Sequence, residues 1–309
     1  MNTSLPRPLA FVFSAGAARA ASQVGMLEAA LEFGLVPDLV VGSSTGAINA
    51  AVFAAHPLTS VTRLAQIWRS IAGDSSLSST WRGAVRGLAG GQSTRTAAML
   101  TKHLGPALDD RSFANLTLDL QLMATDLTSG MPTSIRTGPL IDAVLASCAF
   151  PIMLPPATRD GRLLTDGSVT AGVPVDQALS AGARSIVLFD TGASAVSEAT
   201  LADIGWYQVM AMAFSQLVRG QAAHDLAQVA ATIPVVVISC GQGNPIDLRS
   251  SPSLLDVGRQ VGRQLLDSLP SDISGAGIYG LPIGLADAEE IAALVRFPVD
   301  QPHEPPTHQ

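Results

Sequence analysis

Apolar residues along the chain fall into runs of two kinds, and each kind predicts a different element. Short uninterrupted runs that are rich in branched and aromatic side chains are typical of buried strands. They lie at 9–14, 38–42, 184–190 and 234–239. Longer segments place apolar residues on one face, as Val24, Leu27 and Leu31 do, and therefore predict helices. These lie at 23–33, 47–55, 198–231, 253–268 and 285–295.

The order of these elements predicts the fold class. Strand, helix, strand and helix follow one another within the first 60 residues, an alternation that indicates parallel strands joined by crossover helices. We therefore expect an α/β protein of three layers, α/β/α, around a mostly parallel central sheet. Residues 118–136 predict two further strands around a Thr-Ser-Gly turn. No boundary divides 1–296, which we expect to be one domain, whereas 297–309 are proline-rich and polar and predict a disordered tail.

Composition narrows the range of functions. Hydrophobic residues make up 47% of the 309 residues, yet no apolar run approaches the ~20 residues of a membrane-spanning helix. The first apolar run, 9–13, has the length of a strand, so we do not expect a signal peptide. The net charge of −7 argues against a nucleic-acid partner. Two cysteines make no disulfide framework. We expect a cytoplasmic protein, with room for peripheral contact at a membrane.

A net-basic segment interrupts this acidic chain at about 59–112. From Arg63 to Arg111 there are seven cationic residues against three acidic ones, whereas the rest of the chain has eleven against twenty-two. Such a segment suits anionic lipid headgroups or a substrate phosphate. The simpler explanation for the positive charge is that these arginines lie on solvated helix faces. We therefore expect a helical insert and leave its binding partner unassigned.

The sequence GSSTG at 42–46 has the pattern G-x-S-x-G between a predicted strand and a predicted helix. Glycines two positions before and after Ser44 permit a tight strand-to-helix reversal that exposes its hydroxyl at the carboxyl edge of the sheet. The following helix would aim its first N–H groups at the same place. A plain turn in which Ser43, Ser44 or Thr45 caps the helix explains the residues equally well.

A serine hydroxyl needs a base to become a nucleophile. Asp166 ends a short strand, RLLTD, and precedes a glycine, although a plain Asp-Gly turn would use the same residues. Of the five histidines, His224 follows Asp166 in chain order and would complete a Ser-Asp-His triad, but its surroundings predict a helix and not a loop. No His, Cys or Asp cluster has metal-ligand spacing, so we expect neither a metal nor another cofactor.

A second turn of small residues, SAGAARAAS at 14–22, follows the first predicted strand. Its small side chains let backbone amides approach a bound group closely, as an oxyanion hole requires. Arg19 would stand at the mouth of this turn as a fixed cation.

Together these segments resemble the patatin-like phospholipases, a family of serine lipid acyl hydrolases. The resemblance covers about residues 9–191, and the order and spacing of its motifs make it more specific than any one of them. The motifs are SAGAARAASQVGML at 14–27, GSSTG at 42–46, ATDLTSG at 124–130, ASCAFP at 146–151 and DGS at 166–168, followed by VPVDQALSAGARSIVLFD at 173–190.

The resemblance implies a patatin-like fold and a catalytic dyad, with Ser44 as the nucleophile, Asp166 as its base and no histidine. It also assigns supporting residues: a nucleophile elbow of Gly42, Thr45 and Gly46, and an oxyanion hole of amides near Ala15, Gly16 and Ala17, with Arg19 as stabilising cation. The implied reaction is hydrolysis of a fatty-acyl ester of a phospholipid or lysophospholipid through a Ser44 acyl-enzyme. A carboxylate base would need a partly dry site that raises its pKa.

One departure from the family pattern keeps alternatives open. Ala15, Ala17 and Ala20 stand where the family usually has glycines, and a methyl group at a position that needs a positive φ costs energy. A lipid- or acyl-binding protein that has lost turnover is therefore one alternative, and acyl transfer to an alcohol through the same acyl-enzyme is another. The apolar segment 206–218 predicts a buried helix, or else a lining for the acyl chain.

Overall fold

The computed structural model describes residues 4–77, 93–151, 153–192, 206–245, 247–284 and 289–297. Within these residues the strands form one ten-stranded sheet in the order β10-β9-β8-β7-β1-β2-β3-β6-β5, and β4 pairs with β3 beside that path. The strands are β1 (Leu9–Phe13), β2 (Leu39–Ser43), β3 (Asp119–Asp126), β4 (Pro132–Ile135), β5 (Ala157–Arg159), β6 (Arg162–Asp166), β7 (Ser185–Asp190), β8 (Pro234–Ser239), β9 (Gly277–Tyr279) and β10 (Val295–Phe297). The pairs from β10 to β3 are parallel, and β4, β5 and β6 are antiparallel.

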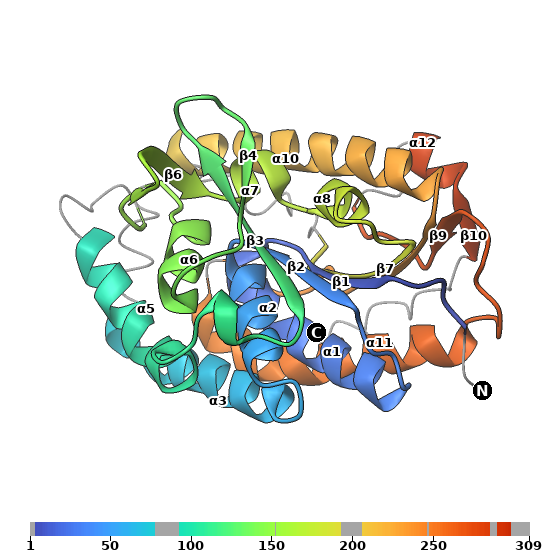
Figure 1. Ribbon diagram of the computed structural model, residues 1–309, viewed down its shortest axis with the longest axis horizontal. Coiled ribbons are helices and arrows are strands. Elements are labelled where there is room, and N and C mark those ends of the chain that lie inside the picture. Colours follow the sequence, from blue (N-terminus) through green and yellow to red (C-terminus); the bar gives the residue numbers. More distant parts are fainter. Residues whose placement is uncertain are drawn as a thin grey trace, which may run out of the picture.

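Helices cover both faces of this sheet (Figure 1). On one face lie α1 (Ser22–Glu32), α2 (Thr45–Ala55), α3 (Ser60–Gly73), α5 (Ser93–Leu108), α6 (Leu140–Ser147) and α11 (Ser251–Ser268). On the other lie α7 (Ser168–Ala171), α8 (Val175–Ser180), α10 (Trp206–Ala230) and α12 (Glu289–Ala292). Short 3-10 helices are η1 (Ala17–Ala21), η2 (Phe113–Asn115) and η3 (Leu248–Ser250). The three-layer α/β/α architecture and the mostly parallel sheet are thus confirmed.

The central strands are buried along their whole length, as their uninterrupted apolar runs predicted. Every residue of β1, β2, β7 and β8 is buried. On the α1 face, the ring centroid of Phe189 lies 4.7 Å from that of Phe13 and 5.1 Å from that of Phe11. This aromatic cluster joins β1 to β7 beneath the carboxyl edge of the sheet, where the first two strand-to-helix turns begin.

The backbones of helices α1 and α11 pack directly against each other on that face. A Cβ added at Gly25 would lie 1.9 Å from the carbonyl oxygen of Leu255, and one added at Gly258 would lie 1.9 Å from that of Ser22. Neither position accepts a side chain without separating the two helices. Because α1 follows directly from the turn 14–22, this contact also fixes that turn against α11.

The strands and helices expected from the sequence are found within the described residues, with shifts of a few residues at their ends. Of the helix expected at 198–231, residues 198–205 lie outside the described residues, and α10 covers Trp206–Ala230. The exception is the helix expected at 285–295. Its described part contains only the short helix α12, and Val295 already belongs to strand β10, which pairs with β9. Phe297, the first residue of the expected disordered tail, is the last residue of β10, and the rest of that segment, 298–309, lies outside the described residues.

The net-basic segment contributes α3 and α5, and its residues 78–92 lie outside the described part. The two helices contact each other and α2, so the expected helical insert packs on the helix that follows Ser44. Among the described residues, no helix is long and apolar enough to cross a membrane.

The register of β6 decides where Asp166 lies. β6 runs antiparallel to β3 and pairs Asp166 with Ala124, while the neighbouring Met123 pairs with Ser43 on the other side of β3. The last residue of β6 is therefore separated from the end of β2 by the width of one strand. Two residues that are 122 positions apart in the chain meet at this point.

Candidate active site

Ser44 occupies the turn between β2 and α2 in a conformation that few side chains adopt. Its φ is 53° and its ψ is −129°, and left-handed backbone at a residue other than glycine is a strain that clusters at functional sites. Both flanking glycines are required. A Cβ at Gly42 would lie 2.6 Å from the Cβ of Ala50, and one at Gly46 would lie 2.4 Å from the carbonyl oxygen of Ser14. The turn therefore closes tightly on both sides of the hydroxyl.

The carboxylate of Asp166 accepts a hydrogen bond directly from the hydroxyl of Ser44. Ser44 Oγ donates to Asp166 Oδ2 over 2.8 Å, and the backbone N–H of Ser168 donates to Asp166 Oδ1 over 2.7 Å. The carboxylate is fully buried. Burial raises its pKa from 3.8 to about 6, against the opposing effect of the hydrogen bonds from Ser168 and Ser44. A carboxylate with this pKa is ionised at neutral pH and basic enough to accept a proton.

The segment at the end of α6 braces the backbone of Ser44 on both sides. The N–H of Ser44 donates to Ser147 Oγ over 3.0 Å, and Ser147 Oγ in turn donates to the carbonyl of Met123 over 2.6 Å. The thiol of Cys148 donates to the carbonyl of Ser44 over 3.0 Å. Burial raises the pKa of Cys148 well above its usual value, so the group stays a neutral thiol. Both peptide groups of the strained residue are thus held by side chains from one neighbouring element.

The turn 14–22 faces Ser44 across the same cavity, and its amides differ in what they bind. The N–H of Ala15 donates to the carbonyl of Gly172 over 2.8 Å, and that of Ala18 donates to the carbonyl of Pro245 over 3.0 Å. Among the described residues, the amides of Gly16 and Ala17 have no acceptor. Of the three amides that the family resemblance named, these two are therefore the ones free to bind an oxyanion.

The alanines at this turn do not share one conformation. Ala17 has a φ of 52°, whereas Ala15 and Ala20 do not hold a positive φ. Only Ala17 therefore bears the cost of a left-handed residue with a methyl group, about 1–2 kcal/mol. Gly16 must be glycine for another reason, because a Cβ there would lie 2.4 Å from Thr191 Cγ2.

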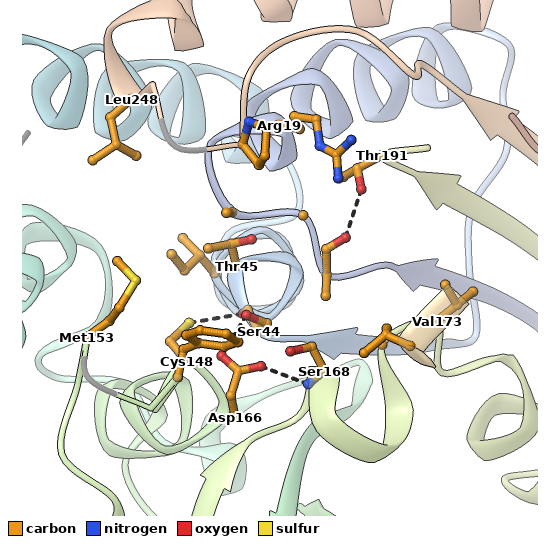
Figure 2. A pocket seen from close by; sticks show the side chains of 18 of the residues that line it. Arg19, Ser44, Thr45, Cys148, Met153, Asp166, Ser168, Val173, Thr191 and Leu248 are labelled. Atoms are coloured by element: carbon orange, nitrogen blue, oxygen red, sulfur yellow. Dashed lines mark hydrogen bonds between the residues drawn. The ribbon is translucent and has the colours of Figure 1, made fainter. Parts of the chain in front are cut away.

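A cavity of about 300 Å³ joins these groups. Figure 2 shows Ser44 and Asp166 near its centre, with the turn that carries Arg19 on one side and Met153 and Leu248 toward another. Part of the lining is apolar and comes from α2, α3, the segment after α3, α5 and the segment after α6: Ile48, Trp68, Ile71, Leu77, Leu100, Phe150, Met153 and Leu154. Another part is polar: Arg19, Asp190, Thr191 and Arg219. An elongated molecule with an apolar chain and a polar end would match this division.

Helix α10 is only partly a core helix. Phe214 and Val218 line the cavity, while Leu217 between them is 74% exposed. The expectation of a wholly buried helix at 206–218 is therefore wrong for this part, and the alternative of a cavity lining fits it. The side chains of 206–212 lie outside the described part of the structure.

No histidine of the described residues lines the cavity. His224 lies exposed on α10, where its ring bonds Gln228 Nε2 over 2.7 Å. His103 contacts Ser70 and Asp74 in the insert. The alternative of a Ser-Asp-His triad is therefore not supported, since Ser44 already bonds a carboxylate without an intervening ring. Within the described residues, no group of His, Cys, Asp and Glu is placed to hold a metal ion.

Comparison with known proteins shows the family of this chain. The family model for patatin-like phospholipase matches residues 11–179. The chain belongs to the patatin-like phospholipase family. Patatin-like phospholipase domain-containing protein ZK370.4 of Caenorhabditis elegans is 29% identical over 64% of this chain and 14% of its own length. Patatin-like phospholipase domain-containing protein 7 of Mus musculus is 30% identical over 60% of this chain and 14% of its own length. The chain thus spans about a seventh of these relatives.

Among solved structures, VipD from Legionella pneumophila superimposes with a TM-score of 0.49 at 13% identity, over 85% of this chain and 67% of that one. The family match ends at residue 179, so β7, β8, α10 and α11 lie beyond it. Arg219, which the cavity receives from one of these later elements, lies outside the family resemblance and carried no motif. Asp190 ends the last stretch of the resemblance, but no role was assigned to it. Ser147 and Cys148 lie inside a recognised motif, but their bonds to Ser44 are visible only in the structure.

Proposed function

We propose that this protein is a serine acyl hydrolase that cleaves fatty-acyl esters of phospholipids or lysophospholipids, with Ser44 as nucleophile and Asp166 as base. The observation that carries the proposal is the 2.8 Å hydrogen bond between a strained serine and a buried carboxylate at a largely apolar cavity. Family membership supports lipid hydrolysis in general, and the dyad supplies chemistry suited to it.

In the first step, Ser44 Oγ bonds to the ester carbonyl carbon while its proton passes to Asp166 Oδ2. The carbonyl oxygen takes up the negative charge, and the amides of Gly16 and Ala17 are the donors available to it. The intermediate collapses when the ester oxygen accepts the proton from Asp166 and leaves as an alcohol. A water molecule then attacks the carbonyl carbon of the acyl-enzyme and gives a proton to Asp166. The bond to Ser44 Oγ breaks, Ser44 Oγ takes that proton back from Asp166, and the fatty acid is released.

The alternative of a binding protein that has lost turnover rests on the alanines of the turn 14–22. Two observations weaken it. Only Ala17 holds a positive φ, and its amide is one of the two that have no acceptor in the described part of the chain. The methyl group therefore does not remove a donor, although it adds strain.

The test is covalent labelling with a fluorophosphonate probe, followed by intact mass and peptide mapping. We expect one adduct per chain, located on Ser44 and absent from Ser44→Ala. Ser43→Ala is the matched control, because Ser43 Oγ is buried beside the site without a bonding partner in the described residues, and it should label like the wild type. Release of fatty acid from a lysophospholipid should follow the same pattern. A folded wild-type protein that neither labels nor releases fatty acid would refute the proposal.

A further inference from the structure

Arg19 carries a positive charge that nothing in the described part of the chain neutralises by direct contact. Its Nε is buried and has no hydrogen-bond partner. Burial is the main cause that lowers the pKa of its guanidinium, and the charge of Asp190 opposes that lowering without forming an ion pair. Arg19 as a whole is partly buried. A partly buried guanidinium without a bonded anion is costly unless an anion reaches it during function.

Asp190 is committed to other partners. Its Oδ2 accepts from Ser239 Oγ over 2.7 Å, and the N–H of Gly192 and the hydroxyl of Ser14 also donate to its carboxylate. Burial raises the pKa of Asp190. Its neighbour Cys240 has a pKa raised by burial as well, so the thiol adds no negative charge. The acceptor capacity of Asp190 is therefore largely used, whereas the donor capacity of the Arg19 guanidinium is not.

Arg219 brings a second cation to the same cavity. It projects from α10, lines the cavity, and lies close enough that its charge lowers the pKa of Arg19. One of its nitrogens donates to the carbonyl of Gly284. The guanidinium keeps further donors, because arginine has five N–H groups in a planar fork. The charges that act on Arg19 include those of Asp190 and Arg219 but not that of Asp166, so two arginines and one carboxylate form the charged group around Arg19. Asp166, the other carboxylate of the cavity lining, lies beside Ser44.

We propose that Arg19 and Arg219 form an anion subsite that binds a phosphate next to the scissile acyl ester. Arg219 is then the residue that makes the protein prefer phosphorylated over neutral acyl esters. The inference rests on the proposed function and names its substrate class, an acylglycerol phosphate or its headgroup esters. Paired guanidinium groups match the planar, bidentate geometry of phosphate oxygens. The apolar lining from α2, α3 and α5 accommodates the acyl chain of the same molecule.

The test compares two substrates that differ only in the phosphate, 1-octanoylglycerol 3-phosphate and 1-octanoylglycerol. The quantity measured is the ratio of their kcat/KM values. Arg219→Gln should lower that ratio about tenfold or more, mainly through KM of the phosphorylated ester, since a bond to a charged partner is removed. Arg219→Lys should retain part of the preference. Arg184→Gln is the matched control, because Arg184 is exposed and does not line the cavity, and it should leave the ratio unchanged.

A binding measurement separates this inference from the proposed function. Titration calorimetry of 1-octanoylglycerol 3-phosphate into Ser44→Ala should give a dissociation constant about tenfold lower than into the double variant Ser44→Ala/Arg219→Gln. This readout needs no turnover. Equal dissociation constants, or an unchanged substrate ratio in Arg219→Gln and Arg219→Lys, would overturn the anion subsite while the hydrolase stands. Loss of labelling and turnover in the wild type, with the difference in affinity intact, would overturn the hydrolase alone.

Discussion

Replacing Asp166 by asparagine should abolish turnover and yet stabilise the folded protein at neutral pH. The two effects have one origin, the burial of a carboxylate with no cation bonded to it. An asparagine side chain at this position could keep both hydrogen bonds, since its oxygen accepts from the N–H of Ser168 and its amide donates to the hydroxyl of Ser44. What the substitution removes is the negative charge and the ability to accept a proton.

The magnitude follows from the pKa of Asp166. Its pKa is about 6 in the folded protein against an ordinary value of 3.8, so the folded state binds the proton more tightly than the unfolded chain does. The stability gained from the protonated carboxyl is fully present below about pH 4 and is lost as the pH rises through about 6. At about 1.4 kcal/mol per pKa unit, the ionised group lowers the free energy of unfolding by roughly 3 kcal/mol above pH 7.

The assay is urea unfolding of the wild type and Asp166→Asn at pH 7.5 and at pH 4. The variant should be more stable by about 3 kcal/mol at pH 7.5, and the difference should shrink toward zero at pH 4. Asp119→Asn is the control, because the side chain of Asp119 is 45% exposed and pairs with Arg136 at the surface. It should change stability by less than about 1 kcal/mol at either pH. A variant destabilised equally at both pH values would refute the claim that burial governs this carboxylate.

Three further predictions concern catalysis and packing. The kcat/KM of the wild type should rise with pH through about 6 and then level, because Asp166 must be ionised to accept a proton; a flat profile from pH 5 to 8 would contradict this. Ala17→Gly should raise the free energy of unfolding by up to about 1 kcal/mol because it relieves a φ of 52°. Ala20→Gly, inside a helix, should lower the free energy of unfolding by about 1 kcal/mol. Thermal melts in which both variants behave alike would count against backbone strain at Ala17. Gly25→Ala should lower the free energy of unfolding by at least about 2 kcal/mol, since its Cβ would lie 1.9 Å from a carbonyl oxygen of α11. Gly220→Ala, whose Cβ would have no atom within 4 Å, should raise the free energy of unfolding by up to about 1 kcal/mol. Similar unfolding midpoints for the two variants would reject the close contact between α1 and α11.

Strong local patterns made much of the fold predictable. The buried strands β1, β2, β7 and β8 are continuous apolar runs, and their order with the intervening helices implied parallel pairing. The short strands β9 and β10 were missed because three residues carry no periodicity, and their place depends on pairing with β8 and with each other. The pattern of 285–295 therefore predicts a helix, although Val295 at its end pairs with strand β9.

The candidate dyad was predictable in its residues but not in its environment. Ser44 and Asp166 stand at strand ends beside glycines, a local signal that the family resemblance strengthened. The bond between them depends on the register of β6 against β3, which sets Asp166 opposite Ala124. Long-range register of this kind leaves no mark in the sequence near either residue. Which amides of the turn 14–22 are free to donate could not be predicted for the same reason. The N–H of Ala15 donates to the carbonyl of Gly172, far away in the chain.

The cavity has an apolar part and a part lined by cations, and this division explains how a carboxylate could serve as base without a histidine. A guanidinium near Asp166 would lower its pKa and make it a poorer proton acceptor. Arg19 and Arg219 line the same cavity, yet the pKa of Asp166 is set by burial and by hydrogen bonds from Ser168 and Ser44, and no arginine is among its causes. Arg19 comes from η1, which follows β1, whereas Asp166 ends β6 on the far side of β2 and β3. Arg219 comes from α10, which packs on α7 and α8 and contacts β8. Sheet order thus separates Arg19 from Asp166, the group that would take a proton in the proposed reaction.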